Sequence, residues 1–311
     1  MKAIAAYAYG GVDQLHLVDL PTPHPGPDDV LVRVRAAGVN LIDAMKRGGY
    51  LPQHRFPLIP GWDVAGVVEA VGQNVTDLTA GDDVYGYNVG AIEGTYAEYS
   101  VVPAPFLAPK PASLSYIEAA AIPCVGLTAY QTVVDRLHVR AGETVAITAA
   151  AGGVGSVAVQ IAVHLGARVI GTASGAHLDY VRGLGAEHVV DYTQGEWVQA
   201  VRAIYPDGVD VALTAIAGET KQQSPGVVRD GGRMAWISGE EQLGPPMERL
   251  IQGVYSFGFP RRDTFAALTR LIDTGALTLP IAAVYPLHDA ANAQERIAQG
   301  HSGGKLVIAV P

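Results

Sequence analysis

The amino-acid sequence predicts an α/β protein in which a doubly wound parallel sheet lies between two β-rich ends of the chain. Residues 1–110 contain short apolar runs separated by Gly, Pro and Asp turn residues, which is typical of a compact β-rich domain. From about Tyr116 onward, strand-like runs alternate with helical patterns, as they do in βαβ units. The length of 311 residues, at about 150 residues per domain, also predicts two domains.

The β-rich part opens with a bend rich in Pro, Gly and Asp, at Pro21–Asp29. The next run, Val30–Ala36, alternates with a period of two, which indicates a half-buried strand. Further strands are expected in apolar runs next to turn residues, at Val64–Val71, Val84–Tyr87 and Tyr96–Val102. The spacing of these runs favours one compact domain.

An Ala-rich helical pattern over Ile117–Val134, interrupted by Pro123 and Gly126, leads into the α/β part. The strands expected there are Thr144–Thr148, Arg168–Thr172, Glu187–Asp191, Val209–Leu213 and Gly232–Ile237. The expected helices are Val154–Leu165, Leu178–Leu184, Thr264–Thr274 and one near Ala290–Ala298, with closing strands at Ile281–Leu287 and Lys305–Val310. Strands and helices in alternation predict a parallel sheet covered by helices.

Composition and charge exclude several classes of protein. With 49% hydrophobic and 16% charged residues, the chain has enough apolar material for a core, so intrinsic disorder is excluded. The net charge of −9 argues against nucleic acid or an anionic membrane as a partner. One cysteine, Cys124, excludes an internal disulfide and a cysteine-rich zinc site. Because no run of about 20 residues lacks Gly, Pro and charge, we expect no transmembrane helix and a soluble, cytoplasmic protein.

The segment Thr148–Gly155 follows an expected strand and opens an expected helix, which is the context of a dinucleotide-binding loop. It has a G-x-G-x-x-G pattern in which Ala150 replaces the first glycine. The second glycine lets the backbone approach a pyrophosphate, and the N-terminus of the helix attracts its charge. We expect the contacts to come from Gly152, Gly153 and Val154. An ordinary glycine-rich turn is the alternative.

The next strand predicts which nicotinamide coenzyme binds. An NAD site usually has Asp or Glu at the end of the second strand, where it holds the ribose 2′-hydroxyl. This strand ends in Ala173-Ser174, with no carboxylate before Asp179. A neutral Ser174, with His177 nearby, suits a 2′-phosphate, so we expect NADPH in preference to NADH. The alternative is that Ser174 and His177 only cap the following helix.

These motifs and several others resemble the zinc-independent quinone oxidoreductase branch of the medium-chain dehydrogenase/reductases, over essentially the whole chain. The landmarks are Ala36-Ala37-Gly38-Val39-Asn40 with Asp43, Ile59-Pro60-Gly61-Trp62-Asp63, Ala65-Gly66-Val67-Val68, Gly81-Asp82-Asp83-Val84, Gly126-Leu127-Thr128-Ala129-Tyr130, Leu184-Gly185-Ala186 and Gly304-Lys305-Leu306-Val307. Each landmark is weak alone, but their order and spacing are specific.

The resemblance implies a GroES-like catalytic domain formed by residues 1–122 and 264–311, with a Rossmann NADPH-binding domain inserted at residues 123–263. It also implies a homodimer that pairs through the edge of the Rossmann sheet, at Gly232–Ile237 or Leu250–Phe259. The loops Gly49–Phe56, Asn88–Glu93 and Glu240–Arg249 are expected to shape the acceptor pocket.

The same comparison implies that no zinc is bound. Zinc-dependent relatives have three catalytic ligands at positions that correspond to Asn40, Trp62 and Cys124 of this chain. Only Cys124 could bind zinc, whereas catalytic zinc sites typically use three protein ligands. Cys124 is then expected to be a small buried apolar residue rather than a reactive thiol.

NADPH without a Lewis acid suits acceptors that are already electrophilic, such as quinones or alkenes conjugated to a carbonyl. The protein must align the reactants and stabilise the developing oxyanion. Asn40 is the candidate polar contact to the coenzyme or to the acceptor oxygen, and the alternative is an Asn that only terminates its strand.

Tyr50 is the second catalytic candidate. The stretch from Asn40 and Asp43 to Gly49-Tyr50 is similar to mitochondrial-type enoyl thioester reductases, in which the matching Tyr is the proposed proton donor. In quinone reductases an aromatic residue here lines the acceptor pocket instead. The third interpretation is that Tyr50 is a loop residue without a role in the reaction.

Four further coenzyme contacts follow from matching positions in the family: Thr128, Tyr192, Ser238 and Phe257. Each has a structural alternative, as a helix-packing, surface, strand-end or core residue. Two other functions stay open. One is an enoyl thioester or polyketide enoyl reductase that depends on Tyr50, and the other is a non-enzymatic NADPH-binding or redox-sensing protein.

Overall fold

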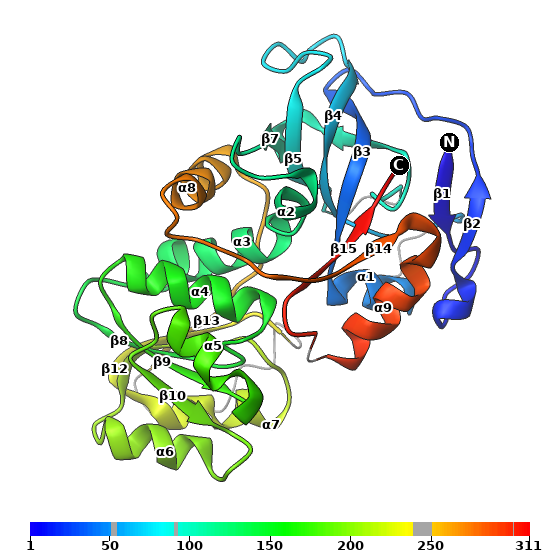
Figure 1. Ribbon diagram of the computed structural model, residues 1–311. Coiled ribbons are helices and arrows are strands. Elements are labelled where there is room, and N and C mark those ends of the chain that lie inside the picture. The colour runs from blue at the N-terminus through cyan, green and yellow to red at the C-terminus, as the bar shows by residue number, and fades with distance from the viewer. Residues whose placement is uncertain (51–54, 90–92, 239–250, 301) are drawn as a thin grey trace. The chain divides into compact units, whose positions relative to one another are not determined.

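The computed structural model describes residues 1–50, 55–89, 93–238, 251–300 and 302–311. The chain forms two compact units (Figure 1). The first unit comprises Met1–Cys124, Phe259–Asp273 and Leu279–Pro311, and the second comprises Val125–Gly258 and Thr274–Thr278. Both ends of the chain therefore fold together, and the second unit is inserted between them.

The first unit contains a seven-stranded sheet in the order β14-β15-β3-β4-β5-β7, with β6 also paired to β3. Its strands are β3 (Asp29–Val39), β4 (Asp63–Val71), β5 (Asp83–Tyr87), β6 (Tyr99–Pro103), β7 (Leu107–Pro109), β14 (Ile281–Pro286) and β15 (Lys305–Ala309). The pairs are antiparallel except for β14 with β15. β1 (Lys2–Ala5) and β2 (His16–Asp19) form a separate antiparallel pair.

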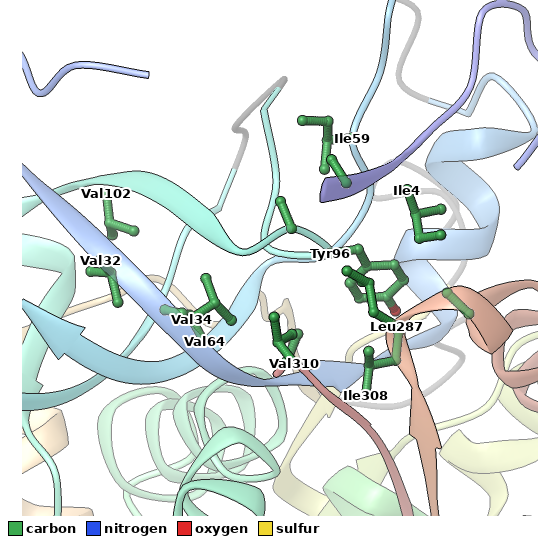
Figure 2. Packing of buried hydrophobic residues seen from close by; sticks show 14 of the residues in the cluster. Ile4, Val32, Val34, Ile59, Val64, Tyr96, Val102, Leu287, Ile308 and Val310 are labelled. Atoms are coloured by element: carbon green, nitrogen blue, oxygen red, sulfur yellow. The ribbon is translucent and has the colours of Figure 1, made fainter. Parts of the chain in front are cut away.

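Short helices accompany this sheet: α1 (Leu41–Arg47), α2 (Tyr116–Ala120), α8 (Arg262–Asp273) and α9 (Ala290–Gln299). Figure 2 shows the apolar core, in which Val34, Val64 and Ile308 from three strands pack near Tyr96 and Leu287. Since β15 comes from the end of the chain, this core joins residues that are far apart in sequence.

The second unit is built on a parallel sheet of six strands in the order β10-β9-β8-β11-β12-β13. The strands are β8 (Thr144–Ile147), β9 (Arg168–Ala173), β10 (His188–Asp191), β11 (Val209–Thr214), β12 (Val228–Trp236) and β13 (Gln252–Tyr255). Numbered within this unit, the order is 3-2-1-4-5-6, the arrangement of a dinucleotide-binding sheet. The expected doubly wound α/β fold with a β-rich companion domain is confirmed.

The helices of this part of the chain are α3 (Pro123–Tyr130), α4 (Gly153–His164), α5 (Leu178–Gly183), α6 (Trp197–Ile204) and α7 (Glu219–Gln223), with a π-helical turn at Gln131–Arg136. The interruption expected at Pro123 within Ile117–Val134 is observed as a break between α2 and α3, whereas α3 continues through Gly126. The Ser115 hydroxyl caps α2, and a new helix starts at Pro123, a residue that suits a first helical turn. Among the described residues, no helix is both long and apolar enough to span a bilayer.

Candidate functional site

Asn40 lies where β3 ends and α1 begins. Its backbone N–H donates to Asp43 Oδ2 at 2.9 Å, which fixes the first turn of α1. Two neighbouring strands bring further polar residues to this point. β15 pairs with β3 so that Leu306 faces Val39, which places Lys305 beside Asn40.

Asp63 starts β4 and reaches the same place because Gly38 has no side chain. A Cβ on Gly38 would lie 2.5 Å from Asp63 Oδ2 and 2.3 Å from the carbonyl oxygen of Ala120. The glycine of the Ala-Ala-Gly-Val landmark is therefore needed for close packing around a buried carboxylate.

Together these residues form a buried polar network, by which we mean Asn40, Asp43, Asp63, Tyr96 and Lys305. The Asn40 amide donates to Asp63 Oδ2 at 2.8 Å and its Oδ1 accepts from Lys305 Nζ at 2.6 Å. Lys305 Nζ also lies 3.4 Å from Asp63 Oδ2, and the Tyr96 hydroxyl donates to Asp43 Oδ2 at 3.0 Å. Asn40 is only 6% exposed, and both polar atoms of its side chain are already bonded within the unit.

Burial sets the electrostatics of this network. It raises the pKa of Asp43 to about 7, although the hydrogen bond from the Asn40 N–H opposes the shift. It also raises the pKa of Asp63, against the attraction of Lys305. The sequence reasoning assigned no role to Asp63 and Lys305, although both lie in landmark segments. Alternation of apolar and polar residues predicts strands. The contact between Lys305 and Asp63, which are 242 positions apart, could be predicted only if the order of the strands in the sheet were known.

Cys124 lies at the edge of this network, where its backbone N–H donates to Asp63 Oδ1 at 2.8 Å. Burial raises the pKa of its thiol to about 12, so the thiolate is disfavoured. Within the described ranges, no cluster of three or more His, Cys, Asp or Glu residues is arranged to hold a metal ion. Asp63, the nearby carboxylate, already binds the ammonium of Lys305 and two N–H groups.

Tyr50 follows α1 in a turn held by a hydrogen bond from its N–H to the carbonyl oxygen of Met45 at 3.0 Å. Its side chain is 51% exposed. The preceding Gly49 has a φ of +92°, and a Cβ there would lie 3.3 Å from the Tyr9 ring. Tyr9 in turn meets Phe56 edge to face, with ring centroids 5.2 Å apart. Tyr50, Tyr9 and Phe56 are all exposed aromatic residues of the first unit. Of the expected pocket loops, residues 51–54, residues 90–92 and the whole of 240–249 lie outside the described residues.

The dinucleotide loop connects β8 to α4, at the carboxyl edge of the parallel sheet. Ala149 adopts the left-handed conformation with φ +49°, and Gly152 is the N-cap of α4. The first N–H groups of a helix have no intrahelical acceptors, so Gly153, Val154 and Gly155 can donate to a pyrophosphate. The loop therefore has the backbone geometry that a dinucleotide requires.

The two glycines of the loop have different tasks. A Cβ on Gly155 would lie 2.2 Å from the carbonyl oxygen of Ala149, whereas one on Gly152 would meet only that oxygen, at 3.2 Å. Gly155 is thus required for close packing of the loop backbone, whereas a side chain at Gly152 would need only a small shift of one carbonyl oxygen.

This difference predicts that one alanine variant loses stability and that the other loses affinity for the coenzyme. Gly155→Ala should lower the free energy of unfolding by about 1 to 3 kcal/mol, because the loop backbone must move. Gly152→Ala should unfold near the wild-type urea midpoint but bind NADPH about ten-fold more weakly, a loss of about 1.4 kcal/mol. Urea titration and calorimetry measure the two effects. Equal destabilisation by both substitutions would contradict the assignment.

The residues expected near the adenosine ribose are brought together by two parallel strands. Ser174 and Tyr192 follow β9 and β10, and the Tyr192 N–H donates to the carbonyl oxygen of Ala173 at 3.3 Å. Ser174 Oγ lies 3.0 Å from His177 Nδ1. Sequence reasoning overlooked Asp191, whose carboxylate also lies at this edge, at the end of β10.

The remaining expected contacts come from α3, β12 and the segment after β13. Thr128 is buried in α3 and packs against Gly258, where a Cβ would lie 2.5 Å from Thr128 Oγ1. Phe257 precedes that glycine and is exposed. Ser238 follows β12, and its buried Oγ has no hydrogen-bond partner within the described part of the chain. A buried hydroxyl without a partner is costly unless a ligand or water satisfies it.

Comparison with known proteins agrees with this architecture. Residues 26–112 match the model of the alcohol dehydrogenase GroES-like domain, and residues 184–308 match the model of the zinc-binding dehydrogenase family. The chain is 36% identical over 323 residues to the NADPH-dependent alkenal/one oxidoreductase of Arabidopsis thaliana, covering 99% of this chain and 79% of that protein.

Two further likenesses span nearly the whole chain. The human quinone oxidoreductase is 31% identical, over 99% of this chain and 97% of that protein. A solved structure described as an NAD-dependent alcohol dehydrogenase is 35% identical with a TM-score of 0.91, over the full length of both chains. The landmarks, the two units and these similarities together establish that the chain belongs to the quinone oxidoreductase-like branch of the medium-chain dehydrogenase/reductase superfamily.

Proposed function

We propose that the protein is an NADPH-dependent oxidoreductase that transfers hydride to quinones or small α,β-unsaturated carbonyls without a metal ion. The observation that carries this proposal is the loop at Gly152, which presents N–H groups of α4 at the carboxyl edge of a 3-2-1-4-5-6 sheet. Similarity to proteins named as alkenal/one and quinone oxidoreductases supports the acceptor class.

The residues of the second unit would hold the coenzyme, which supplies the hydride when bound. Gly152, Gly153 and Val154 would bind the pyrophosphate, and Ser174, His177 and Tyr192 the adenosine ribose. We assign Thr128, Ser238 and Phe257 to the remaining contacts. The Ser238 hydroxyl has the strongest structural support, because it is buried and has no partner among the described residues.

Asn40 and Tyr50 would act on the acceptor. Because both polar atoms of the Asn40 amide are bonded to Lys305 and Asp63, its orientation is fixed before any ligand arrives. A fixed amide that still has a second N–H can stabilise an oxyanion without a reorganisation cost. Metal independence fits the donor set, since Asn40 and Trp62 replace two of the three ligand positions and the thiol of Cys124 is held in its neutral form.

Tyr50 distinguishes this proposal from the alternative of an enoyl thioester or polyketide enoyl reductase. Its exposed phenol could donate a proton to the α-carbon of an enolate, or its ring could only line the acceptor pocket. Quinones accept hydride without a proton donor to carbon, so loss of the hydroxyl affects the two substrate classes differently.

The test is steady-state oxidation of NADPH with a simple benzoquinone, a conjugated enal and an enoyl-CoA. We expect quinone turnover that changes little in Tyr50→Phe. The matched control is Tyr205→Phe, which removes a phenol oxygen near the opposite, amino edge of the second unit's sheet. Turnover limited to the alkenes and reduced about 10²-fold or more in Tyr50→Phe alone would establish the enoyl reductase with Tyr50 as the acid. NADPH binding without turnover of any acceptor would favour a redox-sensing protein.

We also infer that two copies of the chain pair through β13. Among the residues that the structure describes, this strand ends the six-stranded sheet and pairs only with β12. The unpaired side of an edge strand offers N–H and C=O groups to a second copy. The expected pairing segments included Leu250–Phe259, which contains this strand.

The cytoplasmic location expected from the sequence stays a prediction.

A further inference from the structure

Asp191 places a carboxylate at the edge of the second unit where coenzyme selectivity is decided. β10 runs parallel to β9, and Asp191 pairs with Ala173, the residue before Ser174. Asp191 Oδ2 lies 3.0 Å from the position that a Cβ would have on Gly175. The carboxylate therefore sits against the Ser174–His177 loop, although it comes from the third strand of the unit rather than from the second.

This carboxylate is held in place and charged. Its Oδ1 accepts hydrogen bonds from the backbone N–H of Thr193 at 2.9 Å and from the Thr193 hydroxyl at 2.7 Å. The hydrogen bond from the Thr193 side chain is the main cause that lowers the pKa of Asp191 below its ordinary value, and the Gly175 N–H contributes. At neutral pH the loop thus faces a fixed negative charge.

No compensating cation is built into the same loops. Residues 174–177 and 191–194 contain neither Lys nor Arg. Arg182, on the helix that follows, is paired with Asp179 at 2.7 Å. His177 is engaged with the Ser174 hydroxyl. A 2′-phosphate, which carries between one and two negative charges at neutral pH, would meet hydroxyl groups and one carboxylate here.

We propose that Asp191 limits the selectivity of this protein for NADPH, because its carboxylate repels the 2′-phosphate and tolerates the 2′-hydroxyl of NADH. The inference rests on the proposed function, since it concerns the same coenzyme site. An acid at the end of the second strand normally selects NADH by accepting a hydrogen bond from this hydroxyl. Here an acid on the neighbouring strand supplies the same charge, and the Ser174 end of β9 is compatible with either coenzyme.

The test is calorimetric binding of NADPH and of NADH to the full chain, without an acceptor. Asp191→Asn should bind NADPH about five- to ten-fold more tightly, as expected for removing one charge several ångströms from a phosphate. Its affinity for NADH should not rise, which controls for any disturbance of the loop. Asp207→Asn is the matched control, because it removes an exposed Asp that precedes β11 and therefore lies at the opposite edge of the sheet.

Salt dependence separates repulsion from a structural effect. The gain in NADPH affinity of Asp191→Asn should shrink between about 0.02 M and about 0.5 M NaCl, because salt screens exposed charges. An unchanged or lower ratio of NADPH to NADH affinity in Asp191→Asn, or the same gain in Asp207→Asn, would overturn the proposal. Wild type that binds NADPH, combined with any of these results, leaves the proposed function intact. Failure of wild type to bind either coenzyme would refute both.

Discussion

Replacing Lys305 with methionine is expected to lower the free energy of unfolding by about 3 to 5 kcal/mol. Lys305 is 3% exposed and Asp63 is fully buried, so the substitution leaves a carboxylate without its cation inside the first unit. It also removes the donor to Asn40 Oδ1, which lies 2.6 Å from the ammonium. The cost of removing one partner of a buried pair comes mainly from the charge left behind.

Two comparisons make this prediction specific. Lys2→Met is the matched control, because Lys2 and Asp19 form an ion pair that is largely exposed, and it should cost at most about 1 kcal/mol. The double variant Lys305→Met with Asp63→Asn should recover part of the loss, since no unpaired charge remains. Urea denaturation at neutral pH measures all four proteins. A loss below about 1 kcal/mol in Lys305→Met would contradict the prediction and would mean that Asp63 is hydrated or takes up a proton when the ammonium is removed.

The fold could be predicted from the sequence because its signals are local. Thr144–Gly155 contains a β-branched strand, a glycine loop and the start of an apolar helix in consecutive residues, and the structure has β8 and α4 there. The family landmarks added the prediction that the two ends of the chain fold together and that the second unit is inserted between them in the sequence. Boundaries shifted where tertiary pairing extends a strand, as in β12, which begins at Val228 rather than at Gly232.

The sites were harder to predict because their partners are distant in sequence. Asn40 was identified as a polar residue at a strand end, but its bonds to Asp63 and Lys305 depend on β3 lying between β4 and β15. Asp191 was overlooked for the same reason. The search for an acid followed the second strand, whereas the third strand runs parallel to it and ends beside the same loop.

Asp43 is expected to make the stability of the protein fall as the pH rises from about 4 to about 7. Burial raises its pKa in the folded protein from 3.8 to about 7. Between these values the folded state binds a proton that the unfolded state has lost, so its advantage disappears as the proton leaves. At about 1.4 kcal/mol per pKa unit, the free energy of unfolding should decrease by about 3 to 4 kcal/mol across this range.

The hydrogen bonds to Asp43 favour its ionised form, so the rise of its pKa comes from burial and from the like charge of Asp63. The Oδ2 of Asp43 accepts two hydrogen bonds, from the Asn40 N–H and the Tyr96 hydroxyl, while the buried Oδ1 has no partner among the residues that the structure describes. Asp63 faces it with like charge and Lys305 with opposite charge. Lys46 also interacts electrostatically with Asp43. Burial lowers the pKa of Lys46 only to about 8, so it titrates above the pH range of 4 to 7 in which Asp43 acts.

Asp43→Asn isolates this contribution, because an amide has nearly the same shape and no charge. Its oxygen can accept the two hydrogen bonds, and its stability should depend less on pH between pH 5 and pH 7.5 than that of wild type, although Asp63, whose pKa burial also raises, stays in place. From pH 5 to pH 7.5 the variant should therefore gain about 2 to 3 kcal/mol of stability relative to wild type. Asp207→Asn, at an exposed site, should follow the wild-type profile. Parallel profiles for wild type and Asp43→Asn, measured by urea denaturation at several pH values, would mean that Asp43 is ionised throughout. The cations Lys305 and Lys46 would then dominate over burial in this network.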